Sequence, residues 1–198
     1  MALFTGKGDG GTTKVFDTEK GKRISKSSPV AEALGSLDEV NSFLGLCKVK
    51  SAKRGLYVGT THPSFEYIVH ELQEGLFTVQ AEVAGADKSI TPEKIEWVED
   101  IINTIEKELP PIHSFFISGG TELAALFDFS RTLARRAERR VVEVREPIDT
   151  NSKKMKEEWR KVGEHSLAFM NRLSSILYAL ARLSNHKSGI KESAPTYN

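Results

Sequence analysis

The chain has 198 residues, and its 28 Lys and Arg against 27 Asp and Glu leave a formal net charge of +1. This length predicts one domain, residues 1–198, and the near-zero charge argues against binding nucleic acid through bulk positive potential. The single cysteine, Cys47, excludes an internal disulfide, and no apolar run approaches the ~20 residues that span a bilayer. We therefore expect a soluble protein of a reducing compartment, with neither a nucleic-acid nor a membrane partner.

Five amphipathic segments follow a loop of residues 1–28 that is dense in Gly, Thr, Lys and Ser. In each segment the apolar residues recur at three- and four-residue steps, the pattern of a helix with one buried face. This spacing, with the prolines and capping residues, predicts helices at residues 29–50, 65–83, 91–109, 121–145 and 152–186. Strand patterns are nearly absent, apart from a short extended stretch at 114–120. The predicted fold is an all-α, five-helix bundle over residues 29–187, with a tail at 188–198.

Residues 5–13 read TGKGDGGTT and place glycines at the spacing of a dinucleotide-binding fingerprint, Gly6-x-Gly8-x-x-Gly11. The surroundings do not fit that fingerprint, because only five residues precede Gly6 and no βαβ unit surrounds the loop. No Gly-Lys-Ser/Thr closes a Walker A pattern either. Glycines let backbone N–H groups approach an anion closely, and the threonines and Lys7 add donors, so the loop suits a phosphate. A flexible terminus is the alternative.

The segment RTLARRAERR carries five arginines and one glutamate, a local net charge of +4. On a helix, one sector beside the apolar face holds Arg131, Arg135, Glu138 and Arg139. The far flank holds Arg136 and Arg140. Every cation is Arg, whose planar fork suits bidentate binding of phosphate or carboxylate. We therefore favour an anion or a partner's carboxylate among these side chains, with a solvated charged face and an RNA-binding helix as alternatives.

Polar stripes run along the first and fifth helices, opposite their apolar residues. The first stripe contains Asp38, Asn41, Ser42 and Gly45, and the second contains Glu164, Asn171, Ser174, Ser175, Tyr178 and Arg182. Solvent exposure is the favoured interpretation of each stripe alone, but exposed helices more usually carry Glu and Lys. The small residues would also let another helix or a ligand come close. Asp38 is a natural partner for an arginine of the fourth helix, in the same chain or in a neighbour.

The sequence lacks an obvious general base or nucleophile. Its five histidines show no metal-ligand spacing, and no Ser/His/Asp set, CxxC, HExxH or GxSxG is present, so no direct metal ligand is identified. If the protein is an enzyme, a substrate must bring its own nucleophile. The protein would then act by positioning and by stabilising a charged leaving group.

Five motifs together resemble the trimeric, propanediol-utilisation type (PduO) of ATP:cob(I)alamin adenosyltransferase. In chain order they are TGKGDGGTT, KSSPVAEALGSLDEVNSFLG, the SGG at residues 118–120, RTLARRAERR, and FMNRLSS at residues 169–175. Any one of them is unspecific, but their order and spacing over residues 5–182 are highly specific. The resemblance implies homotrimers of five-helix, ferritin-like bundles with each ATP site between two subunits. That arrangement would explain polar stripes on helices that otherwise look buried.

The reaction catalysed by this family is consistent with the absence of an obvious general base from the sequence. Cob(I)alamin is a strong nucleophile that attacks C5′ of ATP, forms adenosylcobalamin and expels triphosphate, so the resemblance implies cob(I)alamin, ATP and Mg²⁺ as ligands. It also implies a cytoplasmic protein, or one of the mitochondrial matrix if a transit peptide has been removed. Further partners would be a cob(II)alamin reductase and a cobalamin-dependent enzyme. A nucleotide-binding regulatory bundle without corrinoid chemistry is the alternative function.

The resemblance assigns roles to individual residues. Four catalytic residues are expected. Asp38 and Arg131 would join adjacent subunits, and Arg135 would contact phosphate. Phe115, or Phe116 beside it, would help to bind the corrinoid with its lower axial base displaced. The loop around the triphosphate would contain Thr5, Gly6, Gly8, Asp9, Gly11, Thr12 and Thr13. The remaining nucleotide-binding residues would be Lys26, Glu138, Arg139 and Asn171. Two features depart from the family pattern: Gly6 and Lys7 replace a basic residue followed by Thr, and residues 50–64 are longer than in many members.

Overall fold

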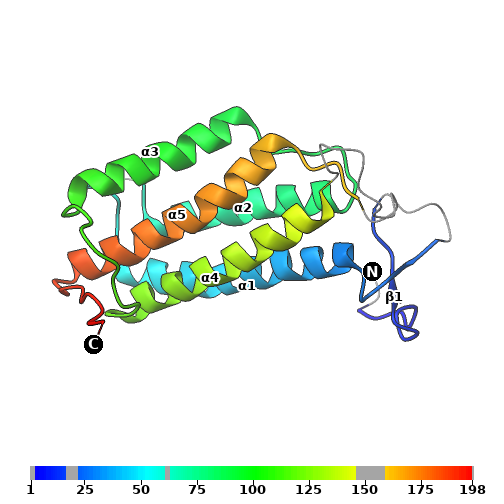
Figure 1. The fold of residues 1–198 in the computed structure, drawn as a ribbon, viewed down its shortest axis with the longest axis horizontal. Helices are drawn as coiled ribbons and strands as arrows, with labels where there is room; N and C mark the ends of the chain where they lie inside the picture. Colours follow the sequence, from blue (N-terminus) through cyan, green and yellow to red (C-terminus); the bar gives the residue numbers. More distant parts are fainter. Residues whose placement is uncertain (1–2, 17–21, 61–62, 146–158, 198) are drawn as a thin grey trace.

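The computed structural model describes residues 3–16, 22–60, 63–145 and 159–197, in which five helices form an elongated bundle (Figure 1). They are α1 (Pro29–Arg54), α2 (Phe65–Val83), α3 (Pro92–Glu108), α4 (Glu122–Val144) and α5 (Glu164–Lys187). Two short strands, β1 (Thr12–Thr13) and β2 (Ile24–Ser25), pair antiparallel near the start of α1. The predicted five-helix architecture is confirmed, with this small hairpin as an addition. No helix in the described ranges combines the length and apolarity needed to cross a membrane.

Local sequence accounts for where most of the helices begin. Ser28, Ser64 and Thr121 cap α1, α2 and α4, because each side-chain oxygen accepts a hydrogen bond from the backbone N–H three residues further on, at 3.1 to 3.3 Å. Proline in the first turn starts both α1 and α3. α1 ends at Gly55, whose φ of +58° is a left-handed conformation that glycine adopts readily.

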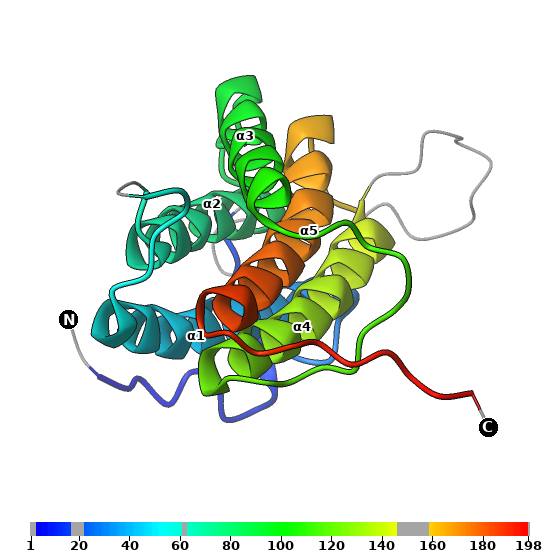
Figure 2. The ribbon, with the colours of Figure 1, turned by 90° about the vertical axis from the view of Figure 1, so that its left-hand side faces the viewer.

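α4 and α5 occupy the middle of the packing. α4 lies against α1 and α5, while α2 packs on α1 and α3 packs on α5 (Figure 2). The core contains the fully buried rings of Phe65 and Phe127, whose centroids are 6.1 Å apart with edge-on geometry. Phe169 of α5 presses on Gly75 of α2 so closely that an added Cβ would overlap its ring. Glycine at this position therefore sets how near α2 can come to α5.

The fifth helix begins later than predicted. The spacing predicted a helix from about Ser152, but residues 159–163 precede α5 and are not helical, while residues 152–158 lie outside the described residues. The backbone N–H of Arg160 instead donates to the carbonyl of Val144 at the end of α4, at 2.6 Å. The N–H of Gly163 donates to Glu82 of α2 at 2.9 Å. These groups are hydrogen-bonded to other elements, so the helix starts only at Glu164.

The segment after α1 closes one end of the bundle. α1 runs to Arg54 rather than to about residue 50, and the loop that follows buries Val58 completely. Glu108 of α3 accepts a hydrogen bond from the N–H of Gly59 and forms an ion pair with Lys187 of α5. Lys187 also donates to the carbonyl of Gly59, at 3.1 Å. Residues 55–60 thus join the last turns of α3 and α5 to the end of α1.

Candidate active site between α4 and α5

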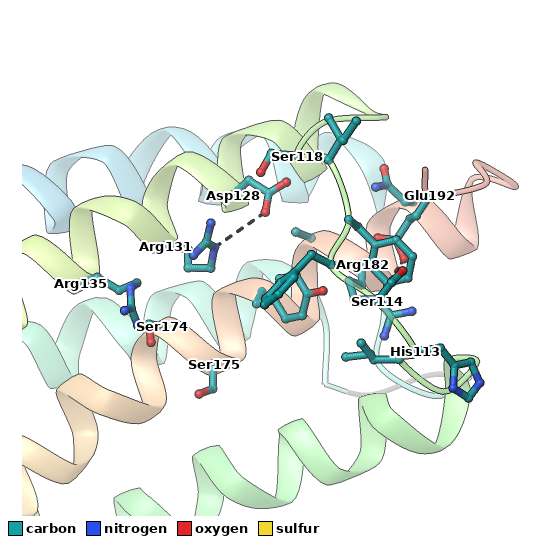
Figure 3. A pocket seen from close by; sticks show the side chains of 17 residues that line it. His113, Ser114, Ser118, Asp128, Arg131, Arg135, Ser174, Ser175, Arg182 and Glu192 are labelled. Atoms are coloured by element: carbon teal, nitrogen blue, oxygen red, sulfur yellow. Dashed lines mark hydrogen bonds and ion pairs between the residues drawn. The ribbon is translucent and has the colours of Figure 1, made fainter. Parts of the chain in front are cut away.

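A pocket of about 590 Å³ opens where α4 and α5 meet the loop of residues 110–120 (Figure 3). Its walls come from that loop, the first half of α4, the second half of α5 and the C-terminal tail. Among its lining side chains are Phe115, Phe116, Asp128, Arg131, Arg135 and Arg182. Three of the predicted catalytic residues, Phe115, Arg131 and Arg135, therefore meet in one pocket of a single chain.

One wall of this pocket is charged. Asp128, Arg131 and Arg135 lie three and four residues apart on α4 and so share one face of the helix (Figure 3). Arg131 Nε is 3.9 Å from Asp128 Oδ1, too far for a hydrogen bond, and this buried nitrogen has no hydrogen-bond partner in the described part of the chain. The side chain of Arg135 is exposed. Both guanidinium groups can therefore bind a further anion.

Asp128 connects the charged wall to the loop. Its Oδ2 accepts a hydrogen bond from the N–H of Gly119 at 3.2 Å, while its Oδ1 faces Arg131. Burial raises the pKa of Asp128, although hydrogen bonds from Gly119 and Ser118 and the charge of Arg131 act in the opposite direction. The carboxylate thus spans the pocket wall and the turn that precedes α4.

Asn185 fixes the same turn from the side of α5. Its Nδ2 donates to the carbonyl of Gly119 at 2.8 Å, and its Oδ1 accepts from the N–H of Thr121 at 2.9 Å. Gly120 has a φ of +98°, and a Cβ there would overlap the amide of Asn185. The SGG motif is therefore a tight turn that only glycine permits, held between α4 and α5.

Aromatic rings form a second part of the wall. Phe115 is 80% exposed although it lines the pocket, whereas Phe116 is half-buried with its ring centroid 5.0 Å from the guanidinium carbon of Arg182. Tyr178 of α5 also lines the pocket, and burial raises its pKa. Arginines beside aromatic rings suit a ligand with a flat apolar part and an anionic part.

The arginines of α4 divide into two groups. Those of the far flank bind carboxylates of α1, with Arg136 paired to Glu39 and Arg140 Nε 3.5 Å from Glu32. Two arginines of the predicted sector have no ion pair with any described residue: they are Arg135 in the pocket wall and Arg139 beyond it. Spacing alone therefore separated the two arginines that pair with α1 from those of the sector that faces the pocket.

The predicted nucleotide residues on α4 and α5 also lie together. Asn171 donates from Nδ2 to Glu138 at 3.4 Å, and its own Oδ1 accepts from Arg172 at 3.0 Å. Glu138 follows Arg135 by three residues on the same face. This polar pair continues the charged wall along α4, away from the loop of residues 110–120.

The glycine loop occupies the other end of the bundle (Figure 1). Gly6 and Gly11 have φ values of +66° and +75°, and the N–H of Gly11 donates to the carbonyl of Gly8 at 3.1 Å. Lys26 crosses the loop, because its N–H donates to the carbonyl of Gly11 at 2.9 Å and its Nζ would lie 3.1 Å from a Cβ added at Gly8. The structure thus brings Lys26 to the loop.

Side chains of the loop make few contacts with the rest of the chain. The hydroxyl of Thr5 accepts from the N–H of Lys7 at 3.4 Å, and the N–H of Asp9 donates to the carbonyl of Gly6 at 3.1 Å. Thr13 pairs with Ile24 in the hairpin. Arg23, which sequence reasoning did not single out, donates from Nε to the hydroxyl of Thr12 at 2.9 Å. The hairpin therefore shapes the loop without attaching it to the pocket.

Two expected groupings are not found within one chain. Asp38 is exposed on α1, and among the described residues it forms no ion pair with Arg131. The glycine loop and the pocket are also separated, since they lie at opposite ends of a bundle whose α4 alone has 23 residues, about 34 Å of helix (Figure 1).

Sequence reasoning missed three of the charged and amide side chains of the pocket: Asp128, Asn185 and Glu192. Asp128 stands three residues before Arg131, and that spacing could have identified it as a neighbour on the helix. Asn185 and Glu192 carry no such signal, because their partners come near only through the packing of α5 and the tail. Within the described ranges, no three His, Cys, Asp or Glu side chains form a cluster that could hold a metal ion.

Comparison with known proteins finds relatives over nearly the whole chain. Residues 3–184 match the family described as cobalamin adenosyltransferase. The corrinoid adenosyltransferase PduO of Citrobacter freundii is 38% identical over 94% of this chain and 50% of its own length. The corrinoid adenosyltransferase of Bacillus subtilis is 34% identical over 96% of this chain and 90% of its own length. The chain thus spans about half the length of the two PduO relatives that it matches.

Solved structures agree with this result. A variant PduO-type ATP:co(I)rrinoid adenosyltransferase from Lactobacillus reuteri, complexed with ATP, has a TM-score of 0.79 and 25% identity. The alignment covers 98% of this chain and 100% of that one.

Proposed function

Because the chain belongs to the cobalamin adenosyltransferase family, we propose that it transfers the 5′-deoxyadenosyl group of ATP to the cobalt of cob(I)alamin. The products are adenosylcobalamin and triphosphate. The observation that carries the proposal is the pocket in which Arg131 and Arg135 lie beside Phe115 and Phe116. Guanidinium groups suit the polyanionic triphosphate, and aromatic rings suit the broad apolar surface of a corrin.

The proposed reaction needs no protein base. The electron pair of Co(I) forms the bond to C5′, while the bond from C5′ to the phosphate oxygen breaks and triphosphate leaves with that bonding pair. No proton moves at the reacting carbon, in keeping with a sequence that has no nucleophile–base motif. The protein contributes by orienting the two substrates and by stabilising the charge that develops on the leaving group. Arg135, exposed and without an ion pair among the described residues, is assigned this stabilising role.

The glycine loop is assigned to the triphosphate. Its left-handed glycines present backbone N–H groups, and Lys26 adds a positive charge over the same loop. The proposed contacts are Thr5, Gly6, Gly8, Asp9, Gly11, Thr12, Thr13 and Lys26. Glu138, Arg139 and Asn171 are assigned to the nucleotide on the side of α4. Support for ATP comes also from the Lactobacillus reuteri relative, which is described as complexed with ATP.

Magnesium belongs to the nucleotide substrate in this proposal. The described residues contain no carboxylate and histidine cluster for a resident metal ion. Mg²⁺ usually binds substrate phosphates, keeps several waters and needs only one or two protein carboxylates. The donors present therefore fit MgATP rather than a metal ion held by the protein alone.

The active site is proposed to lie between subunits of a homotrimer. The glycine loop and the pocket are at opposite ends of one chain (Figure 1), so a single ATP cannot reach both within it. A neighbouring chain can bring its loop to the arginine face of α4. Asp38 of one chain would then pair with the guanidinium group of Arg131 of the next, whose side chain is 30% exposed in the single chain.

Phe115 is assigned to the corrinoid. It is 80% exposed and lines the pocket, whereas Phe116 is half-buried and packs on Arg182. An exposed ring can contact the corrin face and occupy the space of its lower axial base. Phe116 is assigned to the support of the loop.

An anaerobic assay with chemically reduced cobalamin, ATP and Mg²⁺ tests the proposed activity. The expected result is ATP-dependent loss of the cob(I)alamin absorbance, a light-sensitive product and one triphosphate released per turnover. ATP binding without turnover would instead indicate a nucleotide-binding regulatory bundle. No ATP binding would contradict the proposed function altogether.

A further inference from the structure

The C-terminal tail folds back along the loop that carries the pocket's aromatic residues (Figure 2). The chain turns at the end of α5, where Gly189 has a φ of +68° and the N–H of Ile190 donates to the carbonyl of Asn185 at 3.0 Å. Further along, the carbonyl of Ser193 accepts from the N–H of Ile117 at 2.9 Å. The tail and the loop are therefore held together by backbone contacts on the wall of the pocket.

Glu192 of the tail forms an ion pair with Arg182 of α5. The distance between Arg182 Nε and Glu192 Oε2 is 2.9 Å, and the side chains are only 5% and 16% exposed. A buried arginine that loses its carboxylate leaves an uncompensated charge, which is strongly unfavourable. The position of Arg182 thus depends on a residue ten positions further along the chain, in a segment without core-forming spacing.

Arg182 also makes two contacts with the aromatic loop. Its Nη2 donates to the carbonyl of Pro110 at 3.3 Å, and its guanidinium carbon lies 5.0 Å from the ring centroid of Phe116. These contacts support the loop on both sides of residues 111–115. Phe115 itself is exposed, so its direction depends on the backbone that Arg182 and the tail support.

We propose that Glu192 is a positioning residue of the corrinoid site, acting through Arg182 to hold the loop of residues 110–118 where Phe115 can meet the corrin. The inference rests on the proposed function, which supplies the ligand. In this proposal the tail contributes to corrinoid binding, whereas the arginine sector of α4 and the glycine loop bind the nucleotide. The loss of Glu192 should consequently weaken the binding of the corrinoid and leave the binding of ATP unchanged.

Glu192→Gln in the full chain tests this inference, with Glu192→Asp as the conservative variant. A matched control is Glu71→Gln, which removes the carboxylate of another partly buried ion pair, with Lys94 between α2 and α3. The readouts are the dissociation constants of ATP and of cob(II)alamin with ATP present, and the cob(II)alamin absorption spectrum. Because a hydrogen bond to a charged group is removed, we expect about tenfold weaker cob(II)alamin binding by Glu192→Gln. We also expect a smaller ATP-dependent spectral shift, with unchanged ATP binding.

Glu192→Asp should restore most of the corrinoid binding, and Glu71→Gln should bind both ligands as the wild type does. Faster hydrogen exchange at the amide of Ile117 in Glu192→Gln, measured without ligands, would show directly that the loop is released. Wild-type corrinoid binding by Glu192→Gln, or equal weakening of both ligands, would overturn the inference. A wild-type protein that binds no corrinoid would overturn the proposed function as well, so the two failures are distinguishable.

A double variant covers the case in which Glu192→Gln fails to fold. Arg182→Met with Glu192→Met removes both charges at similar volume, a change that buried ion pairs often tolerate. We expect this variant to fold and to bind cob(II)alamin weakly, because the contacts with Pro110 and Phe116 are lost. Wild-type corrinoid binding by the double variant would overturn the positioning role.

Discussion

The two ends of the bundle differ in what a single chain provides. At one end, four segments enclose a pocket of about 590 Å³, and buried side chains such as Arg182 and Asn185 connect them. At the other end, the glycine loop is largely exposed, and among the described residues Lys26 and Arg23 bind it to its own hairpin. Segments with few contacts to the core can change with little effect on global stability. Substitutions in the loop should therefore separate binding from folding, whereas most substitutions in the pocket should affect both.

Arg135 lines the pocket, but its substitution should affect activity without affecting folding. Its loss should lower turnover more than any other substitution considered. Its side chain is exposed, so Arg135→Ala should leave the thermal midpoint nearly unchanged. Removing one preoriented donor to a developing charge typically lowers turnover by about 10²–10³-fold, and we expect a loss of this size. Steady-state kinetics with ATP and reduced cobalamin measure it.

Arg136→Ala is the matched control for Arg135→Ala. Arg136 follows directly on α4 but pairs with Glu39 of α1, so its removal should leave turnover within about twofold because exposed ion pairs contribute little. Equal losses of turnover in the two variants would contradict the division of the α4 arginines into those available to a ligand and those paired with α1.

Asp38→Asn should cause the second-largest loss of activity. Asp38 is exposed in the single chain, so the fold of each subunit should be retained. If the carboxylate pairs with Arg131 of a neighbour, its loss should lower activity about tenfold, as expected for a charge-assisted hydrogen bond. It should also shift the proposed trimer toward smaller species in sedimentation velocity. An unchanged sedimentation profile together with wild-type kinetics would remove Asp38 from the subunit interface.

Substitutions in the glycine loop should change ATP binding and leave the thermal midpoint unchanged. Gly11 has a φ of +75°, which an alanine adopts only with strain, whereas Gly10 has no positive φ and no neighbour near an added Cβ. Strain of roughly 1 kcal/mol corresponds to about a fivefold rise in the KM for ATP for Gly11→Ala, and Gly10→Ala should behave like the wild type. Differential scanning fluorimetry should give the same thermal midpoint for both. A lower midpoint for Gly11→Ala would show that the loop contributes to the fold after all.

Asp128→Asn should give the smallest effect, and it concerns stability. Burial raises the pKa of Asp128, so the folded state binds more protons than the unfolded state between the ordinary and the raised pKa. This group therefore lowers the free energy of unfolding as pH rises through that window, and the penalty is fully present above it. Asp128→Asn removes the penalty, so its thermal midpoint at pH 7 should be up to about 3 °C above the wild type.

The advantage of Asp128→Asn should shrink as the pH falls through the raised pKa, because the wild-type carboxyl then becomes neutral as well. Thermal melts between pH 4 and pH 8 measure this convergence. A lower midpoint for Asp128→Asn at pH 7 would show that the hydrogen bonds from Gly119 and Ser118 outweigh burial.

Much of the fold could be predicted because its signals are local. The apolar steps of α1 to α4 and the capping residues Ser28, Ser64 and Thr121 act within a few residues of their own positions. The start of α5 could not be predicted in this way. Periodicity continued to about Ser152, but Arg160 and Gly163 donate their backbone N–H groups to Val144 and Glu82, and such competition depends on distant elements.

Part of the candidate site could be predicted for the same reason. Arg131 and Arg135 share a helix face at a fixed spacing, so their neighbourhood follows from the sequence. Phe115 was expected near them only from the resemblance, and Glu192 was not expected at all. Its role depends on a reversal at Gly189 and on the buried place of Arg182, which no spacing rule contains.

The sequence by itself thus determined the five helices apart from the start of α5, their buried faces and which arginines share one sector of α4, because periodicity and capping act over a single turn. The motif order was enough to indicate the family. Only the tertiary structure decided that the glycine loop and the pocket lie at opposite ends of one chain, and that the tail supports the aromatic loop (Figures 1 and 2). These features arise from packing between segments far apart in the chain, where the free energy of burying apolar surface outweighs local preference.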